Sequence, residues 1–261
     1  MELTAWEKVK LARMSLRPTG LDYIEGIFDE FLELHGDRCF GDDKAIVSGI
    51  GFLDDLPVTV IAQQKGKNTK ENIARNFAMP HPEGYRKALR LMKQAEKFSR
   101  PVICFIDTPG AFCGIGAEER GQGQAIASNL AEMMRLRTPI ISIVISEGGS
   151  GGALALGVAD KIFMLEHAIY SILSPEGFAS ILYKDASKAE QAADEMKLTA
   201  QDLYKYQIID GIIREPEGGA HNNKKQVIQD VKLVIEESLG QIKNLPIDSL
   251  LDKRYQKFRE M

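Results

Sequence analysis

Two short glycine-bearing segments carry the residue types best suited to binding a negatively charged oxygen. Gly148–Gly152 holds four glycines around one serine, and the turn Asp107–Ala111 ends in glycine and alanine. Small residues leave backbone N–H groups uncovered, and such groups stabilise an oxyanion that forms during a reaction. Glycines also permit tight turns and close packing of a helix on a sheet, which is the alternative interpretation. The candidate catalytic residues are Gly110, Ala111, Gly148 and Gly149.

Each segment follows an apolar, β-branched run that predicts a strand buried on both faces. The runs are Val102–Ile106 and Ile140–Ile145. Helical patterns follow them, at about Glu118–Leu136 and Ala153–Val158. In an open parallel sheet, ligands bind at the carboxyl ends of the strands. We therefore expect the two glycine-bearing segments to lie side by side at one edge of an α/β sheet.

Signals further upstream predict the rest of the sheet and its covering helices. Pro18–Asp22 predicts the start of a helix, with Thr19 and Asp22 forming a capping box. Apolar residues at helical spacing then predict one buried stripe, formed by Ile24, Ile27, Phe28 and Phe31. Turn residues Asp54-Asp55 predict a hairpin, and a later helix is expected to begin at Pro82. The strands of that hairpin are Ala45–Phe52 and Val58–Gln63.

Composition excludes several classes of protein and site. A chain of 261 residues with 44% hydrophobic content can form one large domain with a core of its own. Its formal net charge of −4 gives no field to hold a polyanion, so no nucleic-acid partner is expected. The three cysteines form no Cys-x-x-Cys pair and the four histidines lie far apart, so we expect no bound metal. No apolar run approaches the ~20 residues of a membrane span, and charge interrupts the N-terminal residues. We therefore expect a soluble, cytoplasmic protein.

One motif favours a different chemistry. Gly148-x-Ser150-x-Gly152 matches the nucleophile elbow of serine hydrolases and lies between a predicted strand and a predicted helix. An elbow needs only its two outer glycines, whereas four glycines favour backbone donors. A serine hydrolase using Ser150 and a non-catalytic scaffold are the alternatives. The base that such a serine requires could come from His167 or His221, oriented by Asp160 or Asp210.

Taken together, motifs from about Arg17 to Tyr255 resemble the carboxyltransferase alpha subunit of bacterial acetyl-coenzyme A carboxylase. The resemblance implies an α/β crotonase-like fold, which is a spiral of ββα units with peripheral helices. It implies a single domain over 1–261, with an N-terminal helical segment (1–36), a core (37–220) and C-terminal helices (221–261). The matching segments are Gln64–Lys67, Thr69–Asn72, Asn76-Phe77, Met79-Pro80, Pro82–Arg90, Asp107–Ala111, Gly116–Gln122, Glu147–Ala155, Ser174–Gly177, Glu215-Pro216 and Gly218–His221.

The resemblance also implies a reaction and partners. A carboxyl group moves from carboxybiotin, held on a biotin carboxyl carrier protein, to acetyl-CoA. The product is malonyl-CoA, and the step is the first committed one of fatty-acid synthesis. The resemblance implies an alpha2beta2 assembly with a beta subunit, and biotin carboxylase in the full ATP-dependent complex. It implies no covalently bound cofactor on this chain and zinc on the beta subunit only.

By resemblance, Gly110, Ala111, Gly148 and Gly149 lie on the biotin side of a site shared with the beta subunit. The basic segment 65–97 holds nine Lys or Arg against three Glu, and it forms either a solvated helix face or a contact for coenzyme A phosphates or acidic partner groups. Phe112-Cys113 stands where the family has Tyr-Pro, which removes a ring that would stiffen the loop. The remaining candidates for binding biotin or coenzyme A are Gly151, Gly152, Phe112, Lys65, Lys67 and Arg75.

Overall fold

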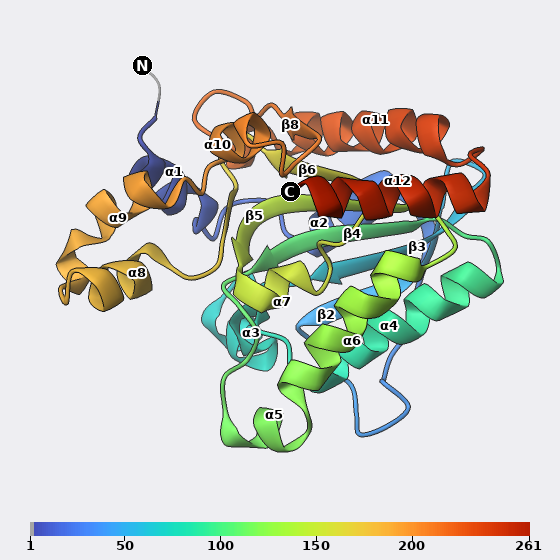
Figure 1. Cartoon of the computed structure of the whole chain (residues 1–261), viewed down its shortest axis with the longest axis horizontal. Coiled ribbons are helices and arrows are strands. Elements are labelled where there is room, and N and C mark those ends of the chain that lie inside the picture. The colour runs from blue at the N-terminus through green and yellow to red at the C-terminus, as the bar shows by residue number, and fades with distance from the viewer. Residues whose placement is uncertain (1–2) are drawn as a thin grey trace.

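A mixed eight-stranded sheet forms the centre of the computed structural model, which describes residues 3–261 (Figure 1). The strand order is β1-β2-β3-β4-β5-β6-β8, and the short β7 pairs with β5. The first three strands pair antiparallel, and the other pairs are parallel. The strands are β1 (Asp29–Glu33), β2 (Ile46–Leu53), β3 (Leu56–Gln63), β4 (Val102–Thr108), β5 (Ile140–Gly149), β6 (Lys161–Leu165), β7 (Ile169–Ser171) and β8 (Gly211–Ile213).

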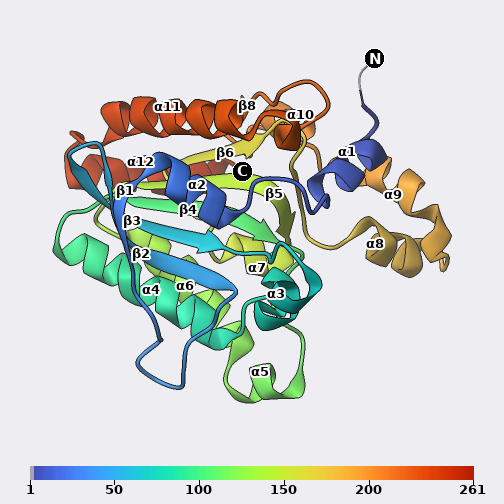
Figure 2. The same cartoon turned by 180° about the vertical axis from the view of Figure 1, so that it is seen from behind.

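Helices cover both faces of this sheet. Helices α4 and α6 pack side by side on one face, and α2 packs on the other against α11 (Figure 1 and Figure 2). Helices α8 and α9, together with α1, project to one side of the sheet. The bounds are α1 (Ala5–Ala12), α2 (Gly20–Ile27), α3 (Thr69–Ala74), α4 (Pro82–Lys97), α5 (Ile115–Glu119), α6 (Gln122–Arg135), α7 (Ser150–Leu154), α8 (Pro175–Leu182), α9 (Ala189–Met196), α10 (Ala200–Lys205), α11 (Lys224–Ile242) and α12 (Ile247–Glu260), with 3-10 turns η1 (Asn76–Ala78), η2 (Ala186–Lys188) and η3 (Ala220–Asn223).

The predicted central strands and hairpin are confirmed. Every residue of β4 and β5 is buried, as continuous apolar runs in a parallel sheet require. The hairpin is β2 and β3, paired in register from Ile46 with Gln63 to Leu53 with Leu56. The predicted helix start is also confirmed, because the Asp22 carboxylate accepts the Thr19 N–H at 2.7 Å and the Thr19 hydroxyl at 2.9 Å. Across residues 3–261, no helix is long and apolar enough to cross a membrane.

Three predicted helices differ from those observed. The helix expected over Ala153–Val158 is instead α7, which begins earlier at Ser150 and ends at Leu154, where a turn follows. The stripe through Phe31 is wrong because α2 ends at Ile27, where Phe28 turns to extended backbone, and Phe31 lies in β1. Pairing of β1 with β2 overrides the helical spacing there. The single helix expected over Glu118–Leu136 is instead α5 and α6. Gly121 separates them with φ of 81°, a left-handed conformation that suits glycine.

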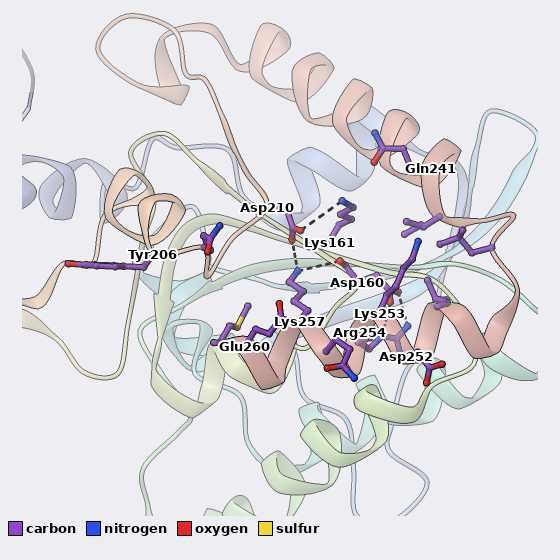
Figure 3. Close-up of a pocket in the computed structure, with 16 residues that line it drawn as sticks. Asp160, Lys161, Tyr206, Asp210, Gln241, Asp252, Lys253, Arg254, Lys257 and Glu260 are labelled. Carbon is purple, nitrogen blue, oxygen red and sulfur yellow. Dashed lines mark hydrogen bonds and ion pairs between the residues drawn. The ribbon is translucent and has the colours of Figure 1, made fainter.

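Arg254 fastens the C-terminal helix α12 to the sheet. Its buried guanidinium donates to both carboxylate oxygens of Asp160, at 2.8 and 2.7 Å. It also donates to the backbone carbonyl oxygens of Met133, Leu136 and Thr138, at 2.7, 2.8 and 2.9 Å. One side chain therefore joins α12, the end of α6 and the start of β6, as Figure 3 shows in part.

We expect Arg254→Ala to lower the free energy of unfolding by about 3–5 kcal/mol, because it leaves Asp160 as an unpaired buried charge. Urea denaturation followed by circular dichroism measures this. Arg137→Ala is the control, since the Arg137 pair with Asp248 is exposed and contributes little. Equal effects of the two substitutions would contradict the assigned role of Arg254.

Candidate functional site

The two glycine-bearing segments meet at the carboxyl ends of β4 and β5. Strand β4 ends at Thr108 and continues into the turn Pro109–Ala111, while β5 runs to Gly149 and α7 begins at the next residue. The expectation that Gly148–Gly152 forms a loop is therefore wrong, because Gly148 and Gly149 end β5 and Ser150–Gly152 begin α7. Gly148 pairs with Thr108 of β4 on one side and with Tyr170 of β7 on the other.

The segments approach each other closely enough to exclude side chains. A Cβ atom placed on Gly149 would lie 2.1 Å from the carbonyl oxygen of Pro109, and one on Gly152 would lie 2.4 Å from the nitrogen of Ala111. Gly149 has φ of −96°, which any residue adopts, so space and not conformation requires glycine there. The prediction that the two segments lie side by side is confirmed. The alternative interpretation, that the glycines permit close packing, is confirmed as well.

The backbone donors at this edge are not equivalent. The Gly110 N–H donates to Thr108 Oγ1 at 3.1 Å, and Gly148 lies within the paired strands. The Ala111 N–H has no hydrogen-bond partner among residues 3–261. In α7, Gly151 and Gly152 lie in the first turn, whose N–H groups lack partners within the helix, and no side chain caps it. Available amides thus come from Ala111, Gly151 and Gly152.

A chain of ion pairs lies at the carboxyl ends of the same two strands. Asp107 of β4 and Glu147 of β5 are only 2% and 9% exposed. The Lys65 ammonium lies 2.5 Å from Asp107 and 3.7 Å from Glu147. Arg13, which follows α1, donates to Glu147 at 2.9 Å and to Glu176 of α8 at 2.7 Å. Burial opposes ionisation of Glu176, but the hydrogen bond from Arg13 holds its pKa below the ordinary value.

Arg17 forms hydrogen bonds with β5 shortly before the carboxyl end of that strand. Its buried guanidinium donates to Ser146 Oγ at 2.9 Å and to the Ile145 carbonyl oxygen at 2.9 Å. It also donates to both carboxylate oxygens of Glu215, at 2.8 and 2.7 Å. Burial raises the cost of charging Glu215, but the paired guanidinium outweighs it and keeps the pKa of Glu215 low. The segment between α1 and α2 is thereby bonded to the strand that carries the site.

Sequence reasoning missed this ion-pair chain and Arg17. A signal was present, because Asp107 and Glu147 each follow a buried run and so had to lie side by side at the sheet edge. Two buried carboxylates require cationic partners. Which cations supply that charge was not visible, since Arg13 and Lys65 come from distant parts of the chain.

These side chains enclose a cavity of about 240 Å³. Its polar lining includes Arg13, Lys65 and the carboxylates of Asp107 and Glu147. Its apolar lining consists of Met14, Phe77 and Pro109. The cavity is therefore lined by both charged and apolar groups, and from the Pro109–Ala111 turn only Pro109 lines it.

The predicted cations do not gather at one place. Lys65 lines the cavity, but Lys67 pairs with Asp22 of α2 at 2.9 Å. The Arg75 guanidinium donates to the Lys44 carbonyl oxygen at 2.8 Å. Neither Lys67 nor Arg75 lines the cavity.

Phe112 is fixed at three points despite the absence of the Tyr-Pro pair. Its ring stacks on the His81 ring, with 4.2 Å between centroids. Its N–H donates to the Pro80 carbonyl oxygen at 3.0 Å, and its own carbonyl oxygen accepts from Gln122 at 2.8 Å. Tertiary contacts replace the stiffness that the loop sequence lacks.

The residues required for a serine hydrolase are not assembled. Ser150 follows the carboxyl end of β5, whereas Asp160 and Asp210 precede β6 and β8, at the opposite edge of the parallel strands. Figure 3 shows both aspartates in a larger cavity of about 640 Å³ with their cationic partners; the Lys257 ammonium lies 2.5 Å from Asp210. Within the described chain, Nδ1 of neither His167 nor His221 has a hydrogen-bond partner. Residues 3–261 also contain no group of three metal-ligating side chains.

We expect Gly149→Ala to destabilise the chain by about 1–3 kcal/mol, because the added methyl group must push the Pro109 turn away from β5. Gly240→Ala is the matched control. Nothing lies within 4 Å of the added atom, and alanine within α11 should stabilise the helix by about 0.5–1 kcal/mol. Thermal unfolding of both variants measures the difference. A Gly149→Ala variant as stable as the parent would contradict the close approach.

Known proteins resemble this chain over its full length. The family described as "Acetyl co-enzyme A carboxylase carboxyltransferase-like" matches residues 1–261. The acetyl-coenzyme A carboxylase carboxyl transferase subunit alpha of Clostridium perfringens is 69% identical over 257 residues, covering 98% of this chain and 95% of that protein. The corresponding subunit of Alkaliphilus oremlandii is 62% identical over 259 residues, covering 99% and 82%.

Solved structures share the fold at low identity. Transcarboxylase 12S, with methylmalonyl-coenzyme A bound, has a TM-score of 0.69 at 18% identity over 84% of this chain and 40% of its own. A Pseudomonas malonate decarboxylase hetero-tetramer in complex with coenzyme A has a TM-score of 0.68 at 18% identity, over 90% of this chain and 91% of that one. The predicted α/β crotonase-like fold and the predicted function are confirmed. The chain belongs to the family of acetyl-coenzyme A carboxylase carboxyltransferase alpha subunits.

Proposed function

We propose that this chain contributes the biotin side of a carboxyltransferase site at the edge where β4 and β5 end. The observation that carries the proposal is the close contact of the Pro109–Ala111 turn with Gly149 and Gly152, which sets unpaired backbone amides at the strand ends, next to a cavity that Pro109 lines. In the reaction, the carboxyl group leaves the biotin nitrogen as CO2, and negative charge develops on the ureido oxygen. Fixed N–H donors stabilise such charge by roughly 2.7–4 kcal/mol each.

The division of roles follows the hydrogen bonds. Ala111, Gly151 and Gly152 provide the free N–H groups. Gly110 provides the turn, since its φ of 152° suits glycine. Gly149 and Gly152 act by letting the segments touch, whereas Gly148 makes room for Tyr170 of β7. These residues therefore act together, as one arrangement of backbone groups that is already in place when the negative charge develops.

The ion pairs of Lys65 and Arg13 neutralise the negative charge of two carboxylates near these backbone donors. Two buried carboxylates would repel an anion that forms above them, and the interaction is strong where water is excluded. Lys65 lies against both Asp107 and Glu147, and Arg13 neutralises Glu147 from the other side. The developing oxyanion therefore meets backbone dipoles rather than uncompensated negative charge. Lys65 acts from the lining of the cavity, and the exposed Lys67 with Arg75 remains the candidate contact for coenzyme A phosphates.

A second charge arises on the acetyl-CoA thioester oxygen once its methyl group loses a proton. The biotin anion can take that proton, so no side-chain base is needed, and the resulting carbanion attacks CO2 to give malonyl-CoA. We assign stabilisation of this second anion to a zinc-bearing beta subunit in an alpha2beta2 assembly. The donor arrives on a biotin carboxyl carrier protein that biotin carboxylase has charged, and this chain holds no covalent cofactor.

We expect the isolated chain to form no malonyl-CoA and to become active when the beta subunit is added. Each subunit alone and the mixture are supplied with a carboxybiotin donor and acetyl-CoA, and malonyl-CoA is measured. Turnover by this chain alone would contradict a shared site. An inactive mixture that nonetheless assembles would contradict the proposed reaction.

We expect Ser150→Ala to retain most of the activity of the assembled complex, because its hydroxyl is given no role. Gly149→Val should abolish activity, because the added side chain pushes the Pro109–Ala111 turn away from the end of β5. A fluorophosphonate probe should leave the parent unlabelled. Labelling at Ser150, with loss of activity in Ser150→Ala, would support the hydrolase alternative. A fully active Gly149→Val complex would support a non-catalytic scaffold.

A further inference from the structure

A left-handed turn presents one aromatic side chain at the cavity. Three consecutive non-glycine residues, Asn76, Phe77 and Ala78, have φ of 48°, 54° and 59°. Residues with a Cβ atom rarely adopt this conformation, and three in succession persist only where surrounding contacts impose them. Such strain is concentrated at ligand clamps and active sites.

The contacts that impose the turn come from the site itself. The Thr108 hydroxyl lies within hydrogen-bond distance of the carbonyl oxygens of both Ala78 and Gly110. The Asn76 side-chain amide lies 2.8 Å from Nδ1 of His81, whose ring stacks on Phe112. The left-handed turn is thus bonded to the same residues that shape the Pro109–Ala111 turn.

The Phe77 side chain, which this turn carries, does not pack in the hydrophobic core. Phe77 is 49% exposed and lines the cavity, where Met14 and Pro109 form the rest of the apolar lining. Lys65 lies in the polar lining of the same cavity. A group bound in this cavity would therefore contact both an apolar surface and charged groups.

We propose that Phe77 is a specificity-determining residue whose ring contacts the apolar face of the ring of the carboxyl donor. The proposal rests on the proposed function. A fused ring with a polar ureido edge and an apolar face matches a cavity whose lining is partly apolar and partly charged. The acetyl group is too small to cover the apolar part of that lining. The contact is made to the donor and not to coenzyme A or the partner subunit.

The test uses the assembled complex with three variants. Phe77→Asn removes the ring but keeps the turn, because asparagine tolerates left-handed backbone. Phe77→Tyr keeps the ring. Phe98→Asn is the matched control, since Phe98 is 57% exposed at the opposite end of α4 from Pro82. KM is measured separately for the carboxybiotin donor and for acetyl-CoA, and the affinity for free biotin is measured by calorimetry.

For Phe77→Asn we expect about a tenfold rise in donor KM, or about 1.4 kcal/mol, with a matching loss of biotin affinity. KM for acetyl-CoA, the melting temperature and complex assembly should stay unchanged. Phe77→Tyr and Phe98→Asn should resemble the parent.

Three results would overturn the proposal for Phe77: an unchanged donor KM, a rise in acetyl-CoA KM instead, or dissociation of the complex. A parent complex that transfers no carboxyl group from the donor would instead refute the proposed function, which separates the two failures.

Discussion

Contact between two backbones is the constraint on which the site depends. Gly149 and Gly152 lie against Pro109–Ala111 with no room for a Cβ atom. This contact brings the end of β4 and the start of α7 together as one rigid edge. An oxyanion site requires donors that are already in place when charge develops, since reorganisation during the reaction would cost free energy. Backbone groups held by a buried parallel sheet meet that requirement better than mobile side chains.

The same geometry places two buried carboxylates close together near this edge. Asp107 and Glu147 occupy neighbouring strands and are almost fully buried, so their charges need partners. Lys65 follows β3, and Arg13 follows α1, so cations from two distant segments supply the compensation. Through Glu176, Arg13 also connects the site to the projecting helix α8. The N-terminal segment is therefore bonded to the strand that carries the proposed site.

Local patterns predicted the elements of the site more reliably than their contacts. The runs that became β4 and β5, the hairpin and the capping box at Asp22 depend on neighbouring residues, and each is observed. The helix through Phe31 was wrong because its spacing fits a helix, while pairing with β2 is more favourable. The hydrolase motif was misleading for a similar reason. A pattern of glycine and serine cannot say on which edge of the sheet a partner aspartate lies.

The sequence by itself determined that two segments of small residues lie at one edge of the sheet. Each segment follows a buried strand, and parallel strands place their carboxyl ends at the same edge. The tertiary structure decided which amides stay free. The N–H of Gly110 is taken by Thr108, whereas that of Ala111 has no partner in the described chain. It also decided that Lys65 faces the cavity while Lys67 faces α2. Hydrogen bonds and ion pairs between distant residues depend on how whole elements pack, and no local spacing encodes that packing.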